Sequence, residues 1–449
     1  MPSPAPPPAR TADISTKDAR SATGAATPPL DPAPTSARPS AQARPSAQAR
    51  PLDVRSAGVD GLRAVAAGAV IACHLRPDLL PGGSVGVDVF FAISGFVITT
   101  LLVDEFERTG RIRLRRFYTR RFLRLVPALM VLCGLVALLA LATPLRAFEG
   151  QWLAALLAAT YVANIVRAGQ SGSYDNTMGS LPHTWSLAVE EQFYLAWPIA
   201  LRALLGRLTS RAVLAVVGAL CLAPTVLRLL IWDDDAAHRI YNGFDTRADQ
   251  LLVGCLLALV LWHLRDDEAA LARIRTWAGR LAWVAAAVLG LVAWRLRITG
   301  WVDGWTPAWY TFGFLAVALL TATVLAVLVL DRRHPLNLLL ALPPLAWVGQ
   351  RLSYGLYLWH YPILAYSGTL HLVPQVEAML VVAGAFVMAG LSYLVVERPL
   401  LRRKQRYTSA RSPYCAVEGD VGCEPPGRRP ARSGDYRQAE LRRRLDSCG

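Results

Sequence analysis

The sequence predicts an all-α protein, a polytopic membrane bundle of about ten transmembrane helices. Hydrophobic residues make up 54% of the 449 residues, and charged residues only 18%. The charges lie mainly in the two end segments and in a few short islands, separated by stretches of roughly 18–22 mostly apolar residues that can cross a bilayer core of about 30 Å. Each stretch is too uniformly apolar for the alternating strands of a membrane barrel. The pattern excludes a soluble enzyme, a coiled coil and a disordered scaffold.

Two polar segments flank the apolar part of the chain. Residues 1–55 are rich in Pro, Ala, Ser and Arg, repeat the hexad ARPSAQ, and lack the apolar core of a signal peptide. We expect this segment to be disordered and cytoplasmic, because its composition cannot bury a core. Residues 401–449 are basic, and we expect them to form a second disordered cytoplasmic tail.

Eleven apolar segments between these tails are candidates for membrane helices. Segment boundaries read from sequence carry an uncertainty of several residues. The segments lie near residues 60–76, 86–103, 125–143, 151–167, 187–205, 212–232, 248–264, 281–298, 309–330, 345–367 and 376–396.

Arginine sets the expected orientation. The stretch 105–124 holds eight Arg against two Glu, and we expect a cytoplasmic loop there. Counting crossings from each end of the chain gives results that disagree by one crossing within 144–205. We resolve the disagreement with ten spans and with 151–167 lying along the membrane or dipping into it. Both termini are then cytoplasmic, and the net charge of +15 reflects positive-inside loops rather than nucleic-acid binding.

The first span carries two ionisable residues, Arg63 and His74. They are eleven residues apart, which places them on nearly the same helix face and about 16 Å apart along the axis. Such groups are costly within an apolar helix unless they face the bundle interior and have a partner. An imidazole in general titrates near neutrality and suits proton abstraction, although a backbone carbonyl can also satisfy a structural histidine.

The second span contains Asp88, Ser94 and Gly95. A carboxylate in an apolar run needs a cation, and we expect Arg63 or Arg121 as the partner of Asp88. Ser94 is a candidate pocket residue and only a weakly signalled nucleophile, because no nucleophile elbow surrounds it. Gly95 is read first as a close helix-packing position.

Arg121 and Arg124 share one helix face at the membrane boundary. Ordinary positive-inside topology accounts for most of the neighbouring arginines. Guanidinium groups also bind phosphate bidentately, and a phosphate-rich donor approaching from the cytosol needs such a patch. We therefore assign Arg121 and Arg124 to donor binding.

Polar and aromatic residues cluster in two further spans. The stretch 183–194 contains Trp185, Glu190 and Glu191, and we interpret it as a polar pocket, although carboxylates also suit the positive end of a helix. The stretch 353–362 places His360 beside aromatic rings, so His360 is another pocket candidate. The cysteines lack the spacing of a zinc site, and we expect no metal.

Together, these motifs resemble those of acyltransferase family 3, the integral-membrane O-acyltransferases that modify cell-envelope sugars and some macrolides. The resemblance covers residues 56–400 and depends on the order and spacing of the motifs. They are the Arg63–His74 pair, FFAISGF at 90–96, RxxR at 121–124, HTWSLAVEEQFY at 183–194, YGLYLWHYP at 354–362 and ERP at 397–399.

The resemblance implies transfer of an acyl group, most commonly acetyl, from cytoplasmic acyl-CoA to an acceptor hydroxyl. Acyl-CoA would be a co-substrate, with no permanently bound cofactor. By the resemblance His74 would be the catalytic histidine, Arg63 its paired motif residue, and Arg121 and Arg124 donor-side residues; we add Glu190 as a third catalytic candidate. Many members carry an extracytoplasmic hydrolase-like domain after the membrane domain, which the 49 residues after Leu400 cannot form.

Several alternatives stay open at this point. We expect a cell-envelope carbohydrate as acceptor, but a macrolide-type metabolite suits a pocket of Trp and Tyr equally well. A transporter or flippase is an alternative of a different class, because intramembrane His, Arg and Glu also mark translocation paths. The hydropathy shows no clear inverted repeat in its favour. In each case we expect a multi-pass protein of the bacterial plasma membrane.

Overall fold

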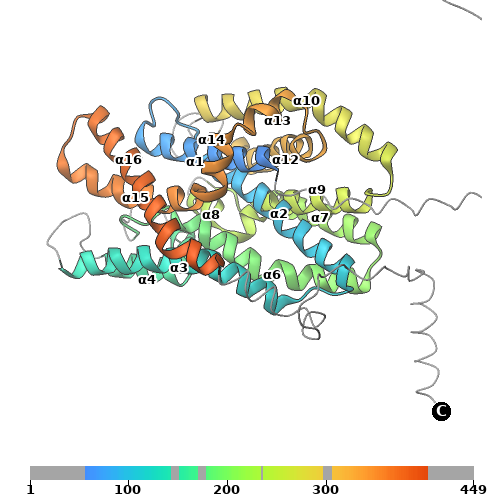
Figure 1. Ribbon diagram of the computed structural model, residues 1–449, viewed down its shortest axis with the longest axis horizontal. Coiled ribbons are helices and arrows are strands. Elements are labelled where there is room, and N and C mark those ends of the chain that lie inside the picture. The colour runs from blue at the N-terminus through green and yellow to red at the C-terminus, as the bar shows by residue number, and fades with distance from the viewer. Residues whose placement is uncertain (1–55, 143–150, 170–177, 234–235, 297–305, 403–449) are drawn as a thin grey trace, which may run out of the picture. The chain divides into compact units, whose positions relative to one another are not determined.

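The computed structural model describes residues 56–142, 151–169, 178–233, 236–296 and 306–402. These residues form helices and no strand, which confirms the all-α prediction (Figure 1). The segments predicted as disordered tails lie outside the described residues, apart from the first two residues of 401–449.

Seven helices among the described residues are long and apolar enough to cross a membrane, which confirms a polytopic membrane protein. Two of them include a π-helical turn, η2 (Trp309–Gly313) before α12 and η4 (Tyr393–Glu397) after α16. The seven are α1 (Ala57–Leu75), α2 (Val85–Thr109), α3 (Leu114–Ala142), α7 (Ser210–Ile231), α10 (Glu268–Arg295), α12 (Phe314–Leu330) and α16 (Pro374–Ser392).

Two further helices, α6 (Thr184–Arg207) and α9 (Phe244–His263), are of similar length, but they are not among the seven and carry charged residues in their first halves. Those charges include Glu190 on α6 and Arg247 on α9, and both residues belong to polar networks described below. Shorter helices complete the described chain: α4 (Gln151–Ala159), α5 (Ala163–Ala168), α8 (Ala237–Asn242), α11 (Thr306–Ala308), α13 (Pro335–Leu340), α14 (Pro343–Arg351), α15 (Ser353–Ser367) and η3 (Gly368–Leu370).

The helices α2 and α9 pack against each other through glycine. A Cβ at Gly95 would overlap the carbonyl oxygen of Leu251, and a Cβ at Gly254 would overlap that of Ala92. Small residues on both helices therefore allow close backbone approach. This confirms the packing interpretation of Gly95.

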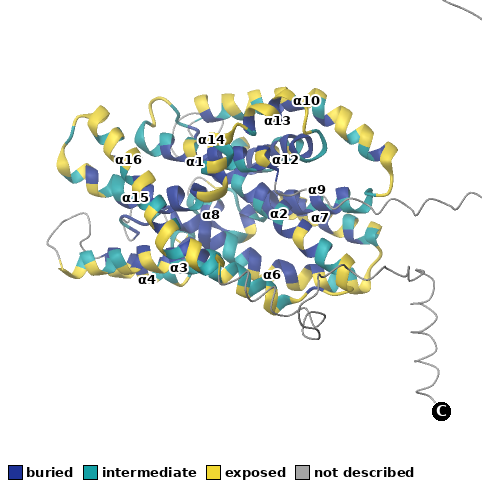
Figure 2. Cartoon of the chain, viewed as in Figure 1, coloured by how far each residue is buried: buried dark blue, intermediate teal, exposed yellow. Residues whose placement is uncertain are grey.

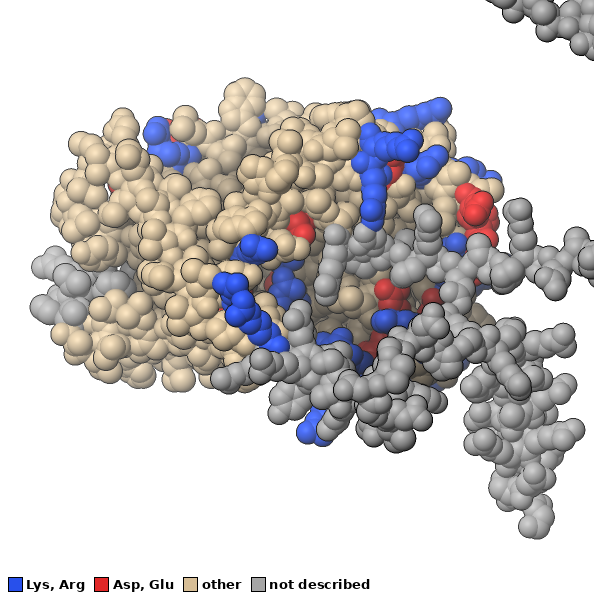
Figure 3. Space-filling view, in the orientation of Figure 1, with Lys and Arg blue, Asp and Glu red and all other residues tan. Residues whose placement is uncertain are grey.

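Among the seven candidate spans, burial is highest along α2 and lowest along α10 and α16 (Figure 2). The exposed faces of the outer helices carry large apolar side chains such as Trp277 and Trp283 on α10, as expected for surfaces that contact lipid. On the face shown in Figure 3, a broad area toward the left is nearly free of Lys, Arg, Asp and Glu. The charged side chains gather mostly in the centre and on the right of the same face.

The stretch 105–124 is mostly helical, and its prediction as a loop is wrong. The helix α2 continues to Thr109, and α3 begins at Leu114. Gly110 ends α2 in the left-handed conformation, with φ of 67°, and its N–H donates to the carbonyl of Phe106. Glycine takes this conformation without strain, which makes a tight turn possible between two long helices.

Two other segments are divided. The segment 151–167 breaks at Tyr161, where φ is 57°, and the nine residues of α4 extend only about 13 Å. This length is too short to cross a bilayer and agrees with its assignment as a non-spanning segment. The segment 345–367, predicted as one span, breaks at Leu352 because α14 packs on α1 whereas α15 packs on α16.

Candidate active site

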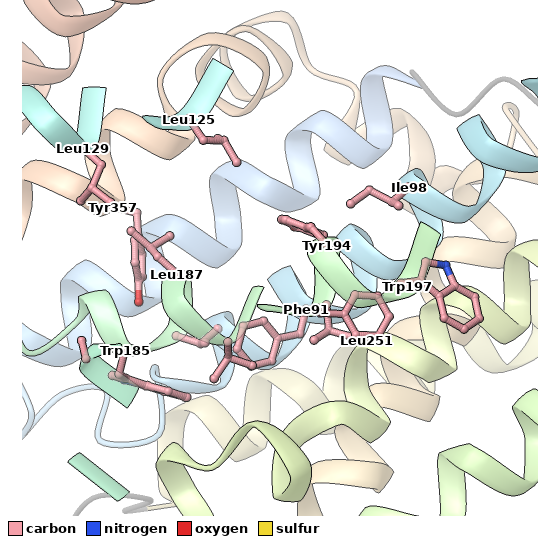
Figure 4. Packing of buried hydrophobic residues seen from close by; sticks show 14 of the residues in the cluster. Phe91, Ile98, Leu125, Leu129, Trp185, Leu187, Tyr194, Trp197, Leu251 and Tyr357 are labelled. Carbon is pink, nitrogen blue, oxygen red and sulfur yellow. The ribbon is translucent and has the colours of Figure 1, made fainter. Parts of the chain in front are cut away.

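A cavity opens between α1, α2, α3, α6 and α15. Five of the predicted site residues line it, and they come from four different helices. The apolar part of the wall includes Phe91, Ile98, Leu125 and Leu187, whose side chains are among those drawn in Figure 4. The polar part consists of Arg63, Ser94, Arg121, Arg124, Ser186, Glu190, Ser353, Tyr354 and Tyr357.

The arginines give this cavity its positive charge. The guanidinium carbon of Arg121 lies 3.7 Å from the centroid of the Tyr194 ring, a cation–π contact that holds Arg121 across the α3–α6 interface. The Nε atoms of Arg63 and Arg121 are buried and have no hydrogen-bond partner among the described residues. Buried donors of this kind normally have an acceptor, and guanidinium donors suit an anionic one.

Glu190 provides the negative charge among these arginines. Ser94 Oγ donates a 2.7 Å hydrogen bond to Glu190 Oε1, which joins α2 to α6. Arg121 and Arg63 both attract the Glu190 carboxylate electrostatically. Glu190 therefore fixes the Ser94 hydroxyl and offsets part of the arginine charge.

A second group of residues surrounds His74, outside the cavity lining. The rings of His74 and His360 have centroids 5.2 Å apart, and His360 Nε2 lies 3.4 Å from His74 Nδ1. His183 stacks on Tyr361 at 5.5 Å and lies 5.3 Å from His360. His74 also hydrogen-bonds the Val70 carbonyl at 2.9 Å, the contact expected of a structural histidine.

Tyr357 connects the cavity to the histidine group. Its hydroxyl donates to the His183 carbonyl at 2.9 Å and lies 2.5 Å from Ser186 Oγ. Its ring lies 5.7 Å from that of His360, while its side chain also lines the cavity. The two groups are therefore parts of one continuous region that runs along α1 from Arg63 to His74.

An ion pair lies just beyond His74, in the turn that follows α1. Arg76 donates to both carboxylate oxygens of Asp78, at 3.0 and 2.7 Å. These hydrogen bonds hold the pKa of the Asp78 carboxyl below its usual value. Both side chains are partly exposed, so the pair marks a solvent-facing end of α1.

Asp88 does not pair with Arg63 or Arg121, and that expectation is wrong. Its carboxylate pairs with Arg247 and accepts a 2.8 Å hydrogen bond from Gln250, both on α9. The guanidinium group of Arg247 is enclosed by the rings of Phe91, Trp185, Tyr241 and Phe314. The close α2–α9 crossing brings Asp88 to α9 rather than to α1 or α3.

Trp185 belongs to this enclosure and not to the cavity lining. Its ring centroid lies 4.9 Å from that of Tyr241 and 6.1 Å from that of Phe91. Glu191, the other pocket candidate on α6, also lies outside the lining, and its Oε1 is buried without a hydrogen-bond partner among the described residues.

The comparisons with known proteins agree with this architecture. Residues 56–397 match the family described as the acyltransferase domain. The chain belongs to this acyltransferase domain family. The match confirms the resemblance found in the motifs.

Three curated relatives of the chain come from bacteria. It is 34% identical to the peptidoglycan O-acetyltransferase OatA of Listeria monocytogenes, over 76% of this chain and 55% of the relative. It is 33% identical to the O-acetyltransferase OatA of Staphylococcus aureus, with 77% and 57% covered. The putative peptidoglycan O-acetyltransferase YrhL of Bacillus subtilis is also 33% identical, with 79% and 56% covered. The chain spans about half the length of the curated relatives it matches, and no solved structure matches it.

The candidate site includes residues that the motif analysis did not single out. His183, Ser186 and Tyr357 connect the two groups, although all three lie within motifs quoted above. Arg228 is fully buried on α7 and donates to Asp249 at 2.7 Å. The sequence signal for Arg228 was a lone arginine inside the apolar run 212–232, because such a charge needs a buried partner.

No group of three or more His, Cys, Asp or Glu residues in the described part of the chain is arranged to hold a metal ion.

Proposed function

We propose that this acyltransferase moves an acetyl group from acyl-CoA to a hydroxyl of a cell-envelope carbohydrate. The observation that carries the proposal is the cavity lined by Arg63, Arg121 and Arg124, which lies on the same helix bundle as His74 and is connected to it through Tyr357. The names of the relatives favour a peptidoglycan glycan as acceptor and acetyl as the transferred group.

The arginine cavity is suited to the anionic part of the donor. CoA carries several phosphate groups, and guanidinium groups bind phosphate through paired hydrogen bonds. Arg63 and Arg121 each keep one buried donor atom without a partner among the described residues, which a phosphate oxygen would satisfy. The long pantetheine arm of CoA would allow the thioester to reach along α1 toward His74.

His74 then acts as the general base. It takes the proton of the acceptor hydroxyl while the hydroxyl oxygen forms a bond to the thioester carbon. The carbon–sulfur bond breaks, and His74 returns the proton to the leaving CoA thiolate. The products are an acetate ester of the acceptor and free CoA thiol, so no other reactant is required.

Thiol release from acetyl-CoA tests the proposal. Purified protein in detergent is supplied with soluble peptidoglycan glycan fragments, and the fragments are examined by mass spectrometry for one added acetyl group. We expect release that requires both the glycan and His74, so that His74→Ala is inactive while it remains folded. Arg121→Gln and Arg124→Gln should raise KM for acetyl-CoA by about tenfold or more, because each removes a charged hydrogen-bond donor.

Arg116→Gln is the matched control for the arginine variants. Arg116 is exposed on the same helix α3 and does not line the cavity. Its KM should stay within about twofold of the wild-type value, as for a surface substitution away from the site. An active His74→Ala variant would refute the role of His74, and folded wild-type protein that releases no thiol with any acyl-CoA would favour transport without acyl chemistry.

A further inference from the structure

His74 on α1 contacts His360 on α15, and this contact indicates a role for His360. We propose that His360 is a positioning residue that holds the His74 ring with Nε2 free to act as the base. This inference rests on the proposed function and names the nitrogen of His74 that takes the acceptor proton. Its evidence is the hydrogen-bond geometry at three ring nitrogens, which are His74 Nδ1 and both nitrogens of His360.

The surroundings of His360 fix its own proton. His360 Nδ1 lies 2.7 Å from the Tyr357 carbonyl oxygen and 3.2 Å from that of Leu356. A carbonyl oxygen only accepts, so Nδ1 carries the proton. In a neutral imidazole the other nitrogen is then an acceptor, and His360 therefore presents an Nε2 lone pair.

The same reasoning fixes the proton of His74. Its Nδ1 lies 2.9 Å from the Val70 carbonyl oxygen and 3.4 Å from His360 Nε2, and both of these atoms accept. His74 Nδ1 is therefore the donor nitrogen in both contacts. The lone pair of His74 is left on Nε2, which is the nitrogen available to an acceptor hydroxyl.

His360 is needed because the Val70 carbonyl is a weak anchor for a charged ring. That oxygen stands four residues before His74 in α1 and already accepts a helical N–H. When Nε2 takes the acceptor proton, the ring becomes a cation whose Nδ1–H needs a stronger acceptor. In Ser-His-Asp triads a carboxylate fills this place. Among the described residues, the acceptors at His74 Nδ1 are the carbonyl and His360 Nε2, with no carboxylate.

Aromatic packing keeps His360 in this orientation. The residue is only 1% exposed, and the rings of Tyr357, Tyr361 and His183 lie 5.7, 6.1 and 5.3 Å from its own. His183 is in turn held by a 3.1 Å hydrogen bond from its Nε2 to the Leu358 carbonyl. The two carbonyl contacts and this packing leave the His360 ring little freedom to turn.

Three substitutions at His360 separate its possible roles. Gln places an amide oxygen near the former Nε2, Asn places its amide near the former Nδ1, and Leu supplies neither. We expect His360→Leu and His360→Asn to lower kcat by about tenfold to a hundredfold, the loss expected from one hydrogen bond to a charged group. The KM for acetyl-CoA should change less than about twofold, because the donor arginines are untouched.

His360→Gln should recover most of the kcat lost in the Leu variant, because its amide oxygen accepts from His74 Nδ1 without taking up a proton. A His360→Gln variant as slow as His360→Asn would overturn the proposal and favour a proton-carrying ring. A His360→Leu variant with wild-type kcat would also overturn it. His371→Asn is the control, since His371 is exposed and its φ of 51° suits asparagine.

The ring protons can also be observed without any reaction. In protein labelled with ¹⁵N-histidine, nitrogen chemical shifts assign the tautomer of each ring, with single substitutions identifying the signals. We expect Nδ1–H for His74 and His360 and Nε2–H for His183. A His74 ring protonated on Nε2 would overturn the inference even if the protein proved inactive. If the wild-type protein shows these tautomers but releases no thiol, the result counts against the proposed function and not against the assignment of the ring protons.

Discussion

The carboxylate of Glu190 places a negative charge beside the arginines that line the cavity. It accepts the Ser94 hydroxyl hydrogen bond and attracts Arg63 and Arg121. Ser94 is therefore engaged by a carboxylate, although no nucleophile elbow surrounds it. The same carboxylate limits repulsion between guanidinium groups that converge on one space.

Substitutions at Glu190 and Ser94 separate the effect of the Glu190 charge from the effect of its hydrogen bond with Ser94. Glu190→Gln keeps an acceptor for Ser94 but removes the charge, and we expect turnover to fall on the order of a hundredfold. Ser94→Ala removes only the hydroxyl and should cost less than about tenfold. Both are measured as thiol release from acetyl-CoA. Equal losses in the two variants would show that Glu190 acts through Ser94 alone.

The helix pair α2 and α9 holds much of the interior together. Gly95 and Gly254 allow the two backbones to approach, and this approach brings Asp88 to Arg247. Arg228 and Asp249 form a second buried pair between α7 and α9. Buried pairs of this kind are strongly destabilising when one partner is removed, so the helix order depends on them.

Substitution of glycine by alanine tests the packing of α2 against α9. Gly95→Ala should lower the free energy of unfolding in detergent by about 1–3 kcal/mol, because the added methyl group meets the Leu251 carbonyl. Gly290→Ala on α10 should be neutral or stabilising by up to about 1 kcal/mol, because nothing lies near a Cβ there and alanine favours helix. Destabilisation of equal size in both variants would contradict the packing role of Gly95.

At the scale of the whole molecule, charged residues at the ends of the helices indicate the orientation of the protein in the membrane. Glu107 near the end of α2 pairs with Arg265 in the turn after α9, so these two helix ends lie together. The Arg-rich start of α3 follows the turn at the end of α2. Arg76 and Asp78 lie after the C-terminal end of α1, which precedes the start of α2. We expect the ends of α2 and α9 to be cytoplasmic, since arginine is retained on that side.

Cysteine labelling measures this orientation. In a background with Cys415, Cys423 and Cys448 changed to Ser, Asp78→Cys should react with a membrane-impermeant maleimide in intact cells. Arg111→Cys should react only after the cells are permeabilised. The four cysteines at described positions are buried and should stay unlabelled in both variants. The reverse pattern would invert the orientation and place the arginine cavity toward the outer face.

The sequence by itself determined the membrane class, most of the long helices, the family, and the residues whose charge within an apolar helix demands a partner. These properties are local, because a bilayer requires about twenty apolar residues in succession and penalises each ionisable group where it stands. Arg63, His74, Glu190 and Arg121 were all visible in this way.

Only the tertiary structure decided which partner each group has. Asp88 meets Arg247 from 159 residues away, and His74 meets His360 from 286 residues away. A charge in an apolar run shows that a partner is required, but not which distant helix supplies it. The division of 345–367 at Leu352 has the same origin, since its two halves pack on different helices. Partner choice depends on how the helices cross, and the crossings depend on contacts such as Gly95 with Leu251 that hydropathy alone does not specify.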